Sequence, residues 1–308
     1  MSNFSKVINL LQYNRGKVCA VLLQYMSFLF PDKLYLSLLF RCKMGYWIDW
    51  KNPKTFSEKL QWLKLYNRKP EYTTMVDKFA VKEYVAKLIG EEYIIPTLGV
   101  WDTPEEINWD ELPNQFVLKT THDSGTVIVC KDKNEIDFKI VKKRLKKSLK
   151  KNYFYHGREW PYKNVKRRII AEQYMKDRDS EDLIDYKFYC FNGEPIYCQV
   201  IRDRRSKETI DFYDRMWEHM SFVGLNPTHD IDIVKNGLKP VAKPANLENM
   251  FSICSKIGNQ IPFVRIDLYS IQEKVYFGEI TFYPASGLGV FTPKEWNDKL
   301  GDLIYLQK

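Results

Sequence analysis

The sequence predicts an α+β protein in which helices dominate the first part of the chain and antiparallel strands the later part. Three observations predict this class: helical spacing of apolar residues over 5–48, a strand, loop, strand pattern at 116–130, and two alternating strands at 263–269 and 275–282. The 308 residues are 44% hydrophobic and 15% aromatic, so the chain can bury a large core. This composition excludes intrinsic disorder for most of the chain.

The charge balance is basic, with 48 Lys and Arg against 39 Asp and Glu and a formal net charge of +9. The excess favours anionic partners such as nucleotide phosphates, acidic glycans, nucleic acid or an anionic membrane, without choosing among them. The longest apolar run, 18–30, is too short to span a bilayer and is interrupted by Gln24 and Ser27. The first residues lack a secretory signal, so we expect a cytoplasmic protein, either free or attached at the inner face of the membrane.

The six cysteines show neither CxxC spacing nor nearby histidine partners. This pattern argues against a zinc site and against a disulfide framework. We expect ordinary core thiols. They are Cys19, Cys42, Cys130, Cys190, Cys198 and Cys254.

Two amphipathic helices are predicted within residues 5–48, with a break at Pro31-Asp32. Packing against the core explains their apolar faces. The alternative is a face that docks on a membrane or a partner, because basic residues flank the apolar stretches as interfacial helices require. These basic residues are Arg15, Lys17, Lys33, Arg41 and Lys43.

The segment Asn52-Pro53-Lys54-Thr55 predicts a turn followed by a helix that runs through Leu63. Thr55 stands at the N-cap, and Glu58 occupies the capping-box position three residues later. A second helix is expected to begin near Asp77. These helices precede the first predicted strands.

Residues 116–119 and 126–130 predict two buried strands joined by a polar loop. Residues 135–151 then predict a helix whose apolar face is Val141, Leu145 and Leu149. A solvated face explains its many lysines and arginines, and a contact with an acidic polymer is the alternative. No aromatic residues interleave with the lysines, so we expect no nucleic-acid partner.

The later part of the chain reads as strands. Residues 168–172 predict a buried strand, and 184–191 should pair with 195–201 across the hairpin turn Asn192-Gly193. A helix is expected over 246–258. The last two strands, 263–269 and 275–282, are joined by a short polar turn.

These last two strands carry the most informative polar residues. Side chains at i and i+2 share a face of a strand, so Arg265 lies with Asp267 and Glu279 lies with Thr281. Two carboxylates there suit Mg²⁺, which prefers oxygen ligands and usually shares substrate phosphates. The alternative is a buried ion pair of Arg265 with Asp267 or Glu279.

Lys119 ends a predicted strand and precedes a small polar loop over 120–126 that is able to cover phosphates with backbone N–H groups. The loop matches neither the P-loop pattern nor the dinucleotide-binding fingerprint. Taken alone, Lys119 is as well explained as an ordinary lysine at the end of a strand.

Taken in order, these segments resemble the nucleotide site of the ATP-grasp superfamily, and more closely the TupA-like (teichuronopeptide biosynthesis-like) family. The segments are 52–63, 77–78, 116–119, 185–188, 264–269 and 276–284. The resemblance implies an ATP-grasp fold, with two α+β lobes that clamp ATP, behind an N-terminal helical extension. It divides the chain into 1–54 (the helical extension), 55–112 (a helical segment of the N-lobe), 113–174 (the ATP-grasp small subdomain) and 175–308 (the C-terminal catalytic subdomain).

The resemblance also implies ATP and Mg²⁺ as cofactors and assigns residues to the nucleotide. Lys78 and Lys119 would contact the α and β phosphates. The loop with Thr121, His122, Ser124 and Gly125 would close over them. Glu172, Gln173 and Met175 would lie at the adenine, with Met175 as its apolar cover. The acid that binds the ribose stays open among Asp177, Asp179, Glu181 and Asp182.

By the same resemblance Lys187 lies near the γ-phosphate, Asp267 and Glu279 hold Mg²⁺, and Arg265 stabilises oxyanionic charge. Two positions depart from the family pattern. Thr281 stands where the superfamily usually has Asn, so it is a weaker metal ligand. Asp123 stands where the TupA-like loop has Gly, so we expect it to adopt a left-handed conformation beside the phosphates.

The implied activity is that of an ATP-dependent carboxylate-amine ligase. It would join an amino acid or small amine to a uronic-acid carboxylate in surface polysaccharide biosynthesis, through an acyl phosphate. The partners would be ATP, an acidic sugar or glycan and an amine. The alternatives are a sugar kinase or a glycosyltransferase-type enzyme of the same pathway, and a non-catalytic carbohydrate-binding protein that uses some of the 8 Trp and 20 Tyr.

Overall fold

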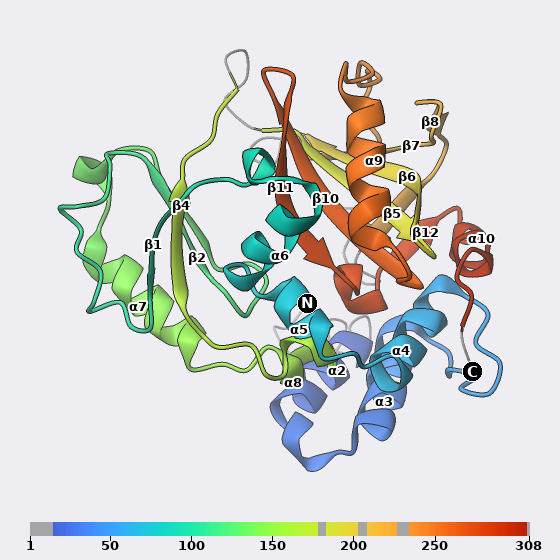
Figure 1. The fold of residues 1–308 in the computed structure, drawn as a ribbon. Coiled ribbons are helices and arrows are strands. Elements are labelled where there is room, and N and C mark those ends of the chain that lie inside the picture. Colours follow the sequence, from blue (N-terminus) through green and yellow to red (C-terminus); the bar gives the residue numbers. More distant parts are fainter. Residues whose placement is uncertain (1–14, 178–182, 203–207, 227–233, 307–308) are drawn as a thin grey trace, which may run out of the picture.

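Two antiparallel sheets and the helices around them organise the chain (Figure 1). The structure is a computed structural model that describes residues 15–177, 183–202, 208–226 and 234–306. The described helices are α2 (Arg15–Tyr25), α3 (Asp32–Met44), α4 (Phe56–Tyr66), α5 (Glu71–Val76), α6 (Ala80–Ile89), α7 (Phe138–Leu149), α8 (Phe154–Gly157), α9 (Leu247–Gly258) and α10 (Trp296–Asp302). Short 3-10 helices lie between these elements; they are η1 (Ser27–Leu29), η2 (Glu91–Tyr93), η3 (Lys133–Glu135), η4 (Trp160–Tyr162) and η5 (Pro284–Gly287).

The smaller lobe is a four-stranded sheet with the order β1-β4-β2-β3. Its strands are β1 (Thr97–Trp101), β2 (Phe116–Thr120), β3 (Val127–Cys130) and β4 (Ile169–Gln173), and all neighbours are antiparallel. Helix α7 packs on it with Val141 and Leu145, which join the buried residues Phe116, Leu118 and Ile169 in one core. The exposed lysines of α7 therefore lie on a solvated face, as predicted.

The larger lobe is a six-stranded sheet with the order β11-β10-β5-β6-β7-β8. Its strands are β5 (Asp185–Phe191), β6 (Glu194–Arg202), β7 (Thr209–Tyr213), β8 (His219–Met220), β10 (Phe263–Ile271) and β11 (Lys274–Thr281), and a separate pair is β9 (Val223–Asn226) with β12 (Val290–Thr292). Helix α9 packs on β5, β6 and β10. The predicted hairpin is confirmed, because Asn192 and Gly193 both have positive φ, 51° and 91°, as a two-residue turn of this kind requires.

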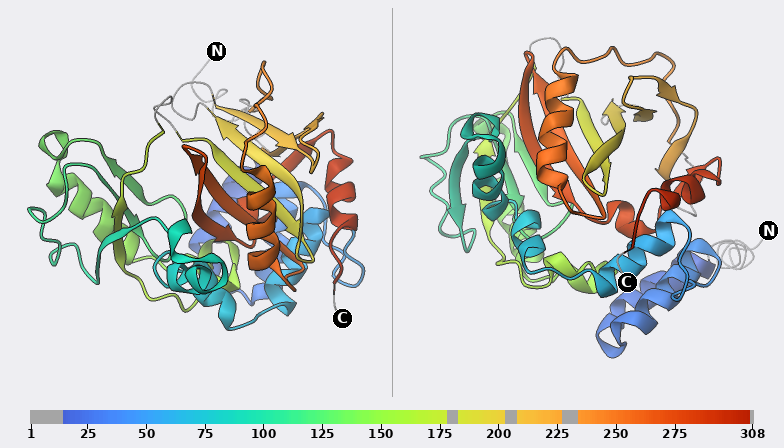
Figure 2. Two further views of the ribbon diagram at one scale, coloured as in Figure 1. Left: turned by 45° about the horizontal axis from the view of Figure 1, so that its top comes forward. Right: turned by 45° about the vertical axis from the view of Figure 1, so that its right-hand side comes forward.

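The N-terminal helices α2 and α3 pack beside α4 at the end of the larger lobe, which the right-hand view of Figure 2 shows. A buried arginine, Arg158, fixes them there with only 2% of its surface exposed. Its guanidinium donates to the carbonyl oxygens of Ser27 and Phe30 and pairs with Asp32 at 2.9 Å. Arg68 binds the other oxygen of Asp32 at 2.7 Å.

The predicted α+β class is confirmed, and so is the capping box: the Thr55 hydroxyl accepts from the Glu58 amide, and the Glu58 carboxylate accepts from the Thr55 amide. The helix expected near Asp77 is α6, which begins at Ala80, and the Asp77 carboxylate accepts from the amides of Phe79 and Ala80 at its start. The thiol prediction is wrong for Cys19, which is exposed; none of the six cysteines, all of which are described, forms a disulfide. In the described ranges, no helix has the length and apolar character needed to cross a membrane.

Candidate active site

A cleft of about 430 Å³ lies between the two sheets, and both lobes supply its walls. The small lobe presents a lysine and an acid, Lys119 and Glu172, with the loop at Ser124 and Gly125. The large lobe presents Asp185, Lys187, Arg265, Asp267 and Glu279. The remaining wall residues are Lys78, Lys82, Ile94, Ile95, Val127, Ile201, Tyr269, Phe277 and Gly278. One side of the cleft is thus rich in lysines, and the other holds paired carboxylates.

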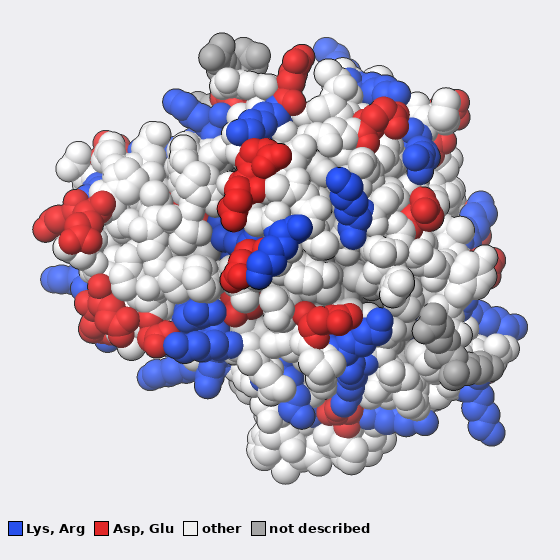
Figure 3. Space-filling view, viewed as in Figure 1, with Lys and Arg blue, Asp and Glu red and all other residues white. Residues whose placement is uncertain are grey.

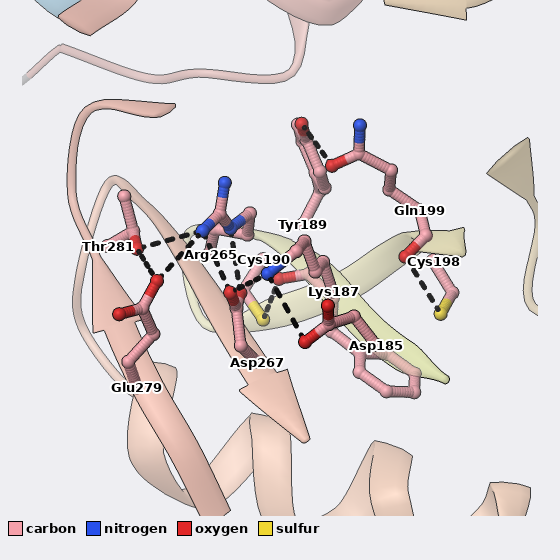
Figure 4. A network of polar contacts seen from close by, with 11 residues as sticks. Asp185, Lys187, Tyr189, Cys190, Cys198, Gln199, Arg265, Asp267, Glu279 and Thr281 are labelled. Carbon is pink, nitrogen blue, oxygen red and sulfur yellow. Dashed lines mark hydrogen bonds and ion pairs between the residues drawn. The ribbon is translucent and has the colours of Figure 1, made fainter. Parts of the chain in front are cut away.

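Strand register brings the residues of the large lobe together (Figure 4). Asp267 on β10 lies opposite Glu279 on β11 and opposite Lys187 on β5. Gly278 permits this approach, because a Cβ there would come within 2.9 Å of the Asp267 carbonyl oxygen. The alternation of side chains along each strand then turns these polar groups toward the cleft.

Arg265 contacts three other residues of this cluster. Its Nε and Nη2 donate to the two carboxylate oxygens of Asp267 at 2.7 and 2.8 Å, and Nη2 also reaches Glu279 at 3.3 Å and the Thr281 hydroxyl at 3.1 Å. Lys187 donates to Asp267 as well and lies 3.8 Å from Asp185. Both ion pairs that the sequence offered as an alternative to a metal site are therefore present.

The two carboxylates of the cluster stand in different surroundings. Burial opposes the ionisation of Asp267, which is 2% exposed, but Arg265 and Lys187 outweigh it and lower the pKa of Asp267. Burial alone would lower the pKa of Arg265, yet Asp267 raises it above its usual value. The Glu279 side chain is 44% exposed. Asp267 therefore holds the two cations in place, while Glu279 offers oxygen to the cleft.

Two lysines share one buried acid on the opposite wall. Glu172 on β4 pairs with Lys119 and with Lys82, each at 2.5 Å. Burial disfavours its charge, but the two lysines outweigh it and lower the pKa of Glu172. Lys82 also donates to the Ile95 carbonyl at 2.6 Å, and burial lowers the pKa of Lys82. Sequence reasoning missed Lys82, because its acidic partner Glu172 lies far along the chain.

The loop after β2 is held together by hydrogen bonds to the carboxylate of Asp123, a residue of the loop itself. Hydroxyls of Thr120, Thr126 and Ser148 all donate to the Asp123 carboxylate at 2.6 Å, and its pKa is lowered by these bonds despite burial. The carboxylate does not line the cleft. The expected left-handed conformation falls on Gly125, with φ 98°, and the expectation for Asp123 is wrong. The Asp123 carbonyl accepts from Lys78.

Nine of the proposed site residues line the cleft, and five are not among its lining residues. The Thr121 hydroxyl donates to the Lys166 carbonyl, and the His122 ring is buried against the Ser148 carbonyl. Gln173 ends β4 with an exposed side chain, and Met175 is half-buried just beyond it. Thr281 binds Arg265 and Glu279. Of the acids considered for the ribose, Asp177 is described, whereas Asp179, Glu181 and Asp182 lie outside the described residues.

The Glu279 carboxylate fits a magnesium ion that is shared with a nucleotide, whereas both oxygens of Asp267 already accept from Arg265 and Lys187. In the described ranges, no group of three or more His, Cys, Asp or Glu is placed to hold a metal by itself. Mg²⁺ is usually bound by one or two carboxylates together with substrate phosphates. Glu279 has one carboxylate oxygen that no described residue binds, and Asp267 faces it across the strand pair. The oxygen donors therefore suit a cation that phosphates also ligate.

The chain matches the model of a known protein family. The model of the TupA-like ATP-grasp family matches residues 58–305. No curated protein matches the chain.

Solved structures with a similar arrangement include ligases. D-Alanine–D-alanine ligase from Bacillus anthracis, complexed with ATP, is 17% identical over 75% of this chain and 63% of that chain, with a TM-score of 0.41. The corresponding ligase from Helicobacter pylori is 15% identical over 81% and 69%, with a TM-score of 0.39. Phosphoribosylamine–glycine ligase from Thermotoga maritima is 14% identical over 68% and 48%, with a TM-score of 0.39. The chain thus spans less than two thirds of the B. anthracis ligase.

Proposed function

Because the chain belongs to the TupA-like ATP-grasp family, we propose that it is an ATP-dependent carboxylate-amine ligase. The proposed product is an amide between an amino acid or small amine and a uronic-acid carboxylate of a surface polysaccharide. The observation that carries this proposal is the cleft with lysines on one wall and the Asp267–Glu279 pair on the other. ATP and Mg²⁺ are the proposed nucleotide and cation.

The proposed reaction has two steps. The γ-phosphoryl group of ATP passes to an oxygen of the acceptor carboxylate, which yields ADP and an acyl phosphate. The amine then attacks the acyl carbon, the amide C–N bond forms, and inorganic phosphate leaves as the amine loses a proton. Enclosure of the acyl phosphate between the lobes would protect it from water.

Each side chain has a physical task in these steps. Lys78, Lys119 and Lys187 neutralise phosphate charge, which is the main requirement of phosphoryl transfer. Arg265 stabilises the oxyanion that forms when the amine attacks. Asp267 and Glu279 would hold Mg²⁺, which when bound supplies Lewis-acid neutralisation of the phosphate oxygens.

Replacing Lys119 with alanine should weaken nucleotide binding. Glu172 keeps Lys82 as a partner in this variant, so the wall should persist while one phosphate contact is lost. A hydrogen bond between charged groups contributes about 1.5–3 kcal/mol, so we expect a loss of about tenfold or more in affinity. Isothermal titration with a non-hydrolysable ATP analogue and Mg²⁺ measures it. Lys139→Ala, on the exposed face of α7, is the control, and equal affinities would remove Lys119 from the site.

Phosphate release tests the reaction itself. A ligase should release inorganic phosphate from ATP only when an acidic sugar and an amine are both present, and the product should contain an amide. Phosphate found on the sugar without an amine would instead identify a sugar kinase. Binding of a UDP-sugar in place of the ATP analogue would favour glycosyl transfer.

We further propose that the tip between α2 and α3 contacts an anionic membrane surface. Ten of the 21 large hydrophobic residues that are exposed in the described ranges lie between Val18 and Trp47. Phe28 and Leu29, at 72% and 62% exposure, form the tip, and its surface carries no charge at the bottom of Figure 3. Lys33 and Arg41 are exposed on α3 behind the tip. Apolar side chains flanked by cations suit the headgroup region of anionic lipid.

Co-sedimentation with vesicles tests this contact. The full chain should bind vesicles that contain phosphatidylglycerol more tightly than pure phosphatidylcholine. Replacing Phe28 and Leu29 together with aspartate should lower the partition by about tenfold or more, because burial of each side chain contributes about 1.5–3 kcal/mol. Ile140→Asp, at a residue 65% exposed on α7, is the matched control. Self-association without vesicle binding would show that a second copy covers the tip instead.

A further inference from the structure

A second cavity, of about 280 Å³, lies between the N-terminal helices and the chain that follows β11. Gln24 on α2, Lys43 on α3 and His156 on α8 supply its polar side chains. The other lining residues are Leu39, Leu225, Ala285, Ser286, Leu288 and Gly289. The family model begins at residue 58, so α2 and α3 add a wall from outside the matched region.

Among the described lining residues of the cavity, Lys43 is the cation, and Gln24 and His156 carry nitrogen atoms. No Asp or Glu lines it within the described chain. Lys43 has no hydrogen bond or ion pair with another described residue, and the nitrogens of Gln24 and His156 approach to 3.5 Å. Burial lowers the pKa of His156, and Lys64, Lys43 and Lys151 lower it further. A site with this charge favours an anionic ligand.

The floor of the cavity is a rigid and strained loop. Ala285 and Ser286 have left-handed backbone, with φ of 47° and 55°, which is costly for residues with a Cβ. Buried Lys64 holds the loop by donating to the Ser286 carbonyl at 2.8 Å and to its hydroxyl at 3.0 Å. Gln61 donates to the carbonyls of Ser286 and Gly287 at 3.1 Å. Strain that is held this firmly is typical of ligand-binding segments.

The cavity is separate from the ATP cleft but close to it along the chain. The two share no lining residue. The loop continues directly from β11, which carries Glu279. Behind Ser286, the buried acid Glu159 interacts with Lys64 and with Tyr162, and Glu279 of the cleft acts on the same tyrosine. A group held in the cavity therefore lies outside the cleft in which ATP is proposed to bind.

We propose that this cavity binds a carboxylate of the acidic glycan acceptor, on a sugar next to the one that reacts in the cleft. Lys43 and His156 are the side chains that would hold that carboxylate, with Gln24 as a further donor. This inference rests on the proposed ligase function. It makes the acceptor an oligomer with at least two acidic sugars rather than a single uronic acid.

Equilibrium titration of the full chain tests the proposal. With Mg²⁺ and the ATP analogue saturating, trigalacturonate should bind more tightly than galacturonate, and the neutral trisaccharide maltotriose should not bind. Lys43→Gln should weaken trigalacturonate binding by about tenfold or more, since a charge-assisted hydrogen bond is lost. Lys51→Gln, an exposed lysine of the same N-terminal segment, is the matched control. The affinity for the ATP analogue should be equal in all three proteins.

A second measurement follows the histidine directly. The chain contains four histidines, so their ring signals are resolvable by NMR, and those of His156 should shift when trigalacturonate binds. Unshifted His156 signals, no trigalacturonate binding to the unaltered chain, or equal affinity of Lys43→Gln and the unaltered chain would each overturn the proposal. Failure of the unaltered chain to bind the ATP analogue would instead overturn the proposed function, and the histidine signals would then report on the cavity alone.

Discussion

Glu279→Gln is expected to lower ATP turnover by about 100-fold or more while the fold survives. The substitution removes the carboxylate charge that faces the cleft. The glutamine side chain keeps the shape of glutamate and still donates and accepts hydrogen bonds. Neutralisation of phosphate charge by a bound metal contributes several kcal/mol, and each 1.36 kcal/mol is a factor of ten in rate. The side chain is 44% exposed and holds Arg265 only at 3.3 Å, so its loss should cost little stability.

Phosphate release at a series of Mg²⁺ concentrations measures this effect, and thermal unfolding verifies the fold. Glu273→Gln is the matched control, because Glu273 lies in the turn between β10 and β11 with an exposed side chain. An unchanged rate and an unchanged Mg²⁺ dependence in Glu279→Gln would show that this carboxylate is not part of the site.

Asp267→Asn is expected to destabilise the fold rather than only the reaction. Asp267 is 2% exposed and accepts from both Arg265 and Lys187, so the amide would leave these two buried cations with only their more distant acids, Glu279 at 3.3 Å and Asp185 at 3.8 Å. Breaking a buried ion pair from one side costs about 3–5 kcal/mol. Urea unfolding monitored by circular dichroism measures the free energy of unfolding. The same acid-to-amide change at Glu279 is the comparison, and equal stabilities of the two variants would contradict the difference in burial.

Two further measurements separate charge from packing. Adding Lys187→Met to Asp267→Asn removes one of the two cations that lost their shared acid, so it should restore part of the lost stability. The pH dependence should change as well. Because the folded pKa of Asp267 is lowered, its stabilisation is present above the unfolded pKa of about 3.9 and is lost as the pH falls through the folded value. Asp267→Asn should therefore lose that component of acid sensitivity.

Local sequence signals predicted the elements that depend on near neighbours. The capping box at Thr55 and Glu58, the turn at Asn192-Gly193 and the alternation of β10 and β11 are all contacts within a few residues or one hairpin. The family resemblance and the ATP-grasp class, which rest on the order of such segments, are confirmed by the family model. The roles assigned to the site residues stay predictions.

Elements without strong local signals were missed. Strand β1 is five residues long, contains Gly99 and gains its place from pairing with β4, about 70 positions later in the chain. The six-residue helix α5 is equally short and packs on α6 and β11. Their existence depends on tertiary neighbours more than on propensity.

By itself the sequence determined the α+β class and placed carboxylates on the last two strands, β10 and β11. It also placed Lys78 before the first predicted strand and Lys119 at the end of that strand. Each of these follows from spacing along one segment, where helix and strand periods decide which side chains share a face. The tertiary structure alone decided that Lys82 and Lys119 share Glu172, that Asp123 turns away from the cleft, and that α2 and α3 wall a second cavity. Those contacts join residues far apart in the chain, and their partners are chosen by strand register and by packing that no local pattern encodes.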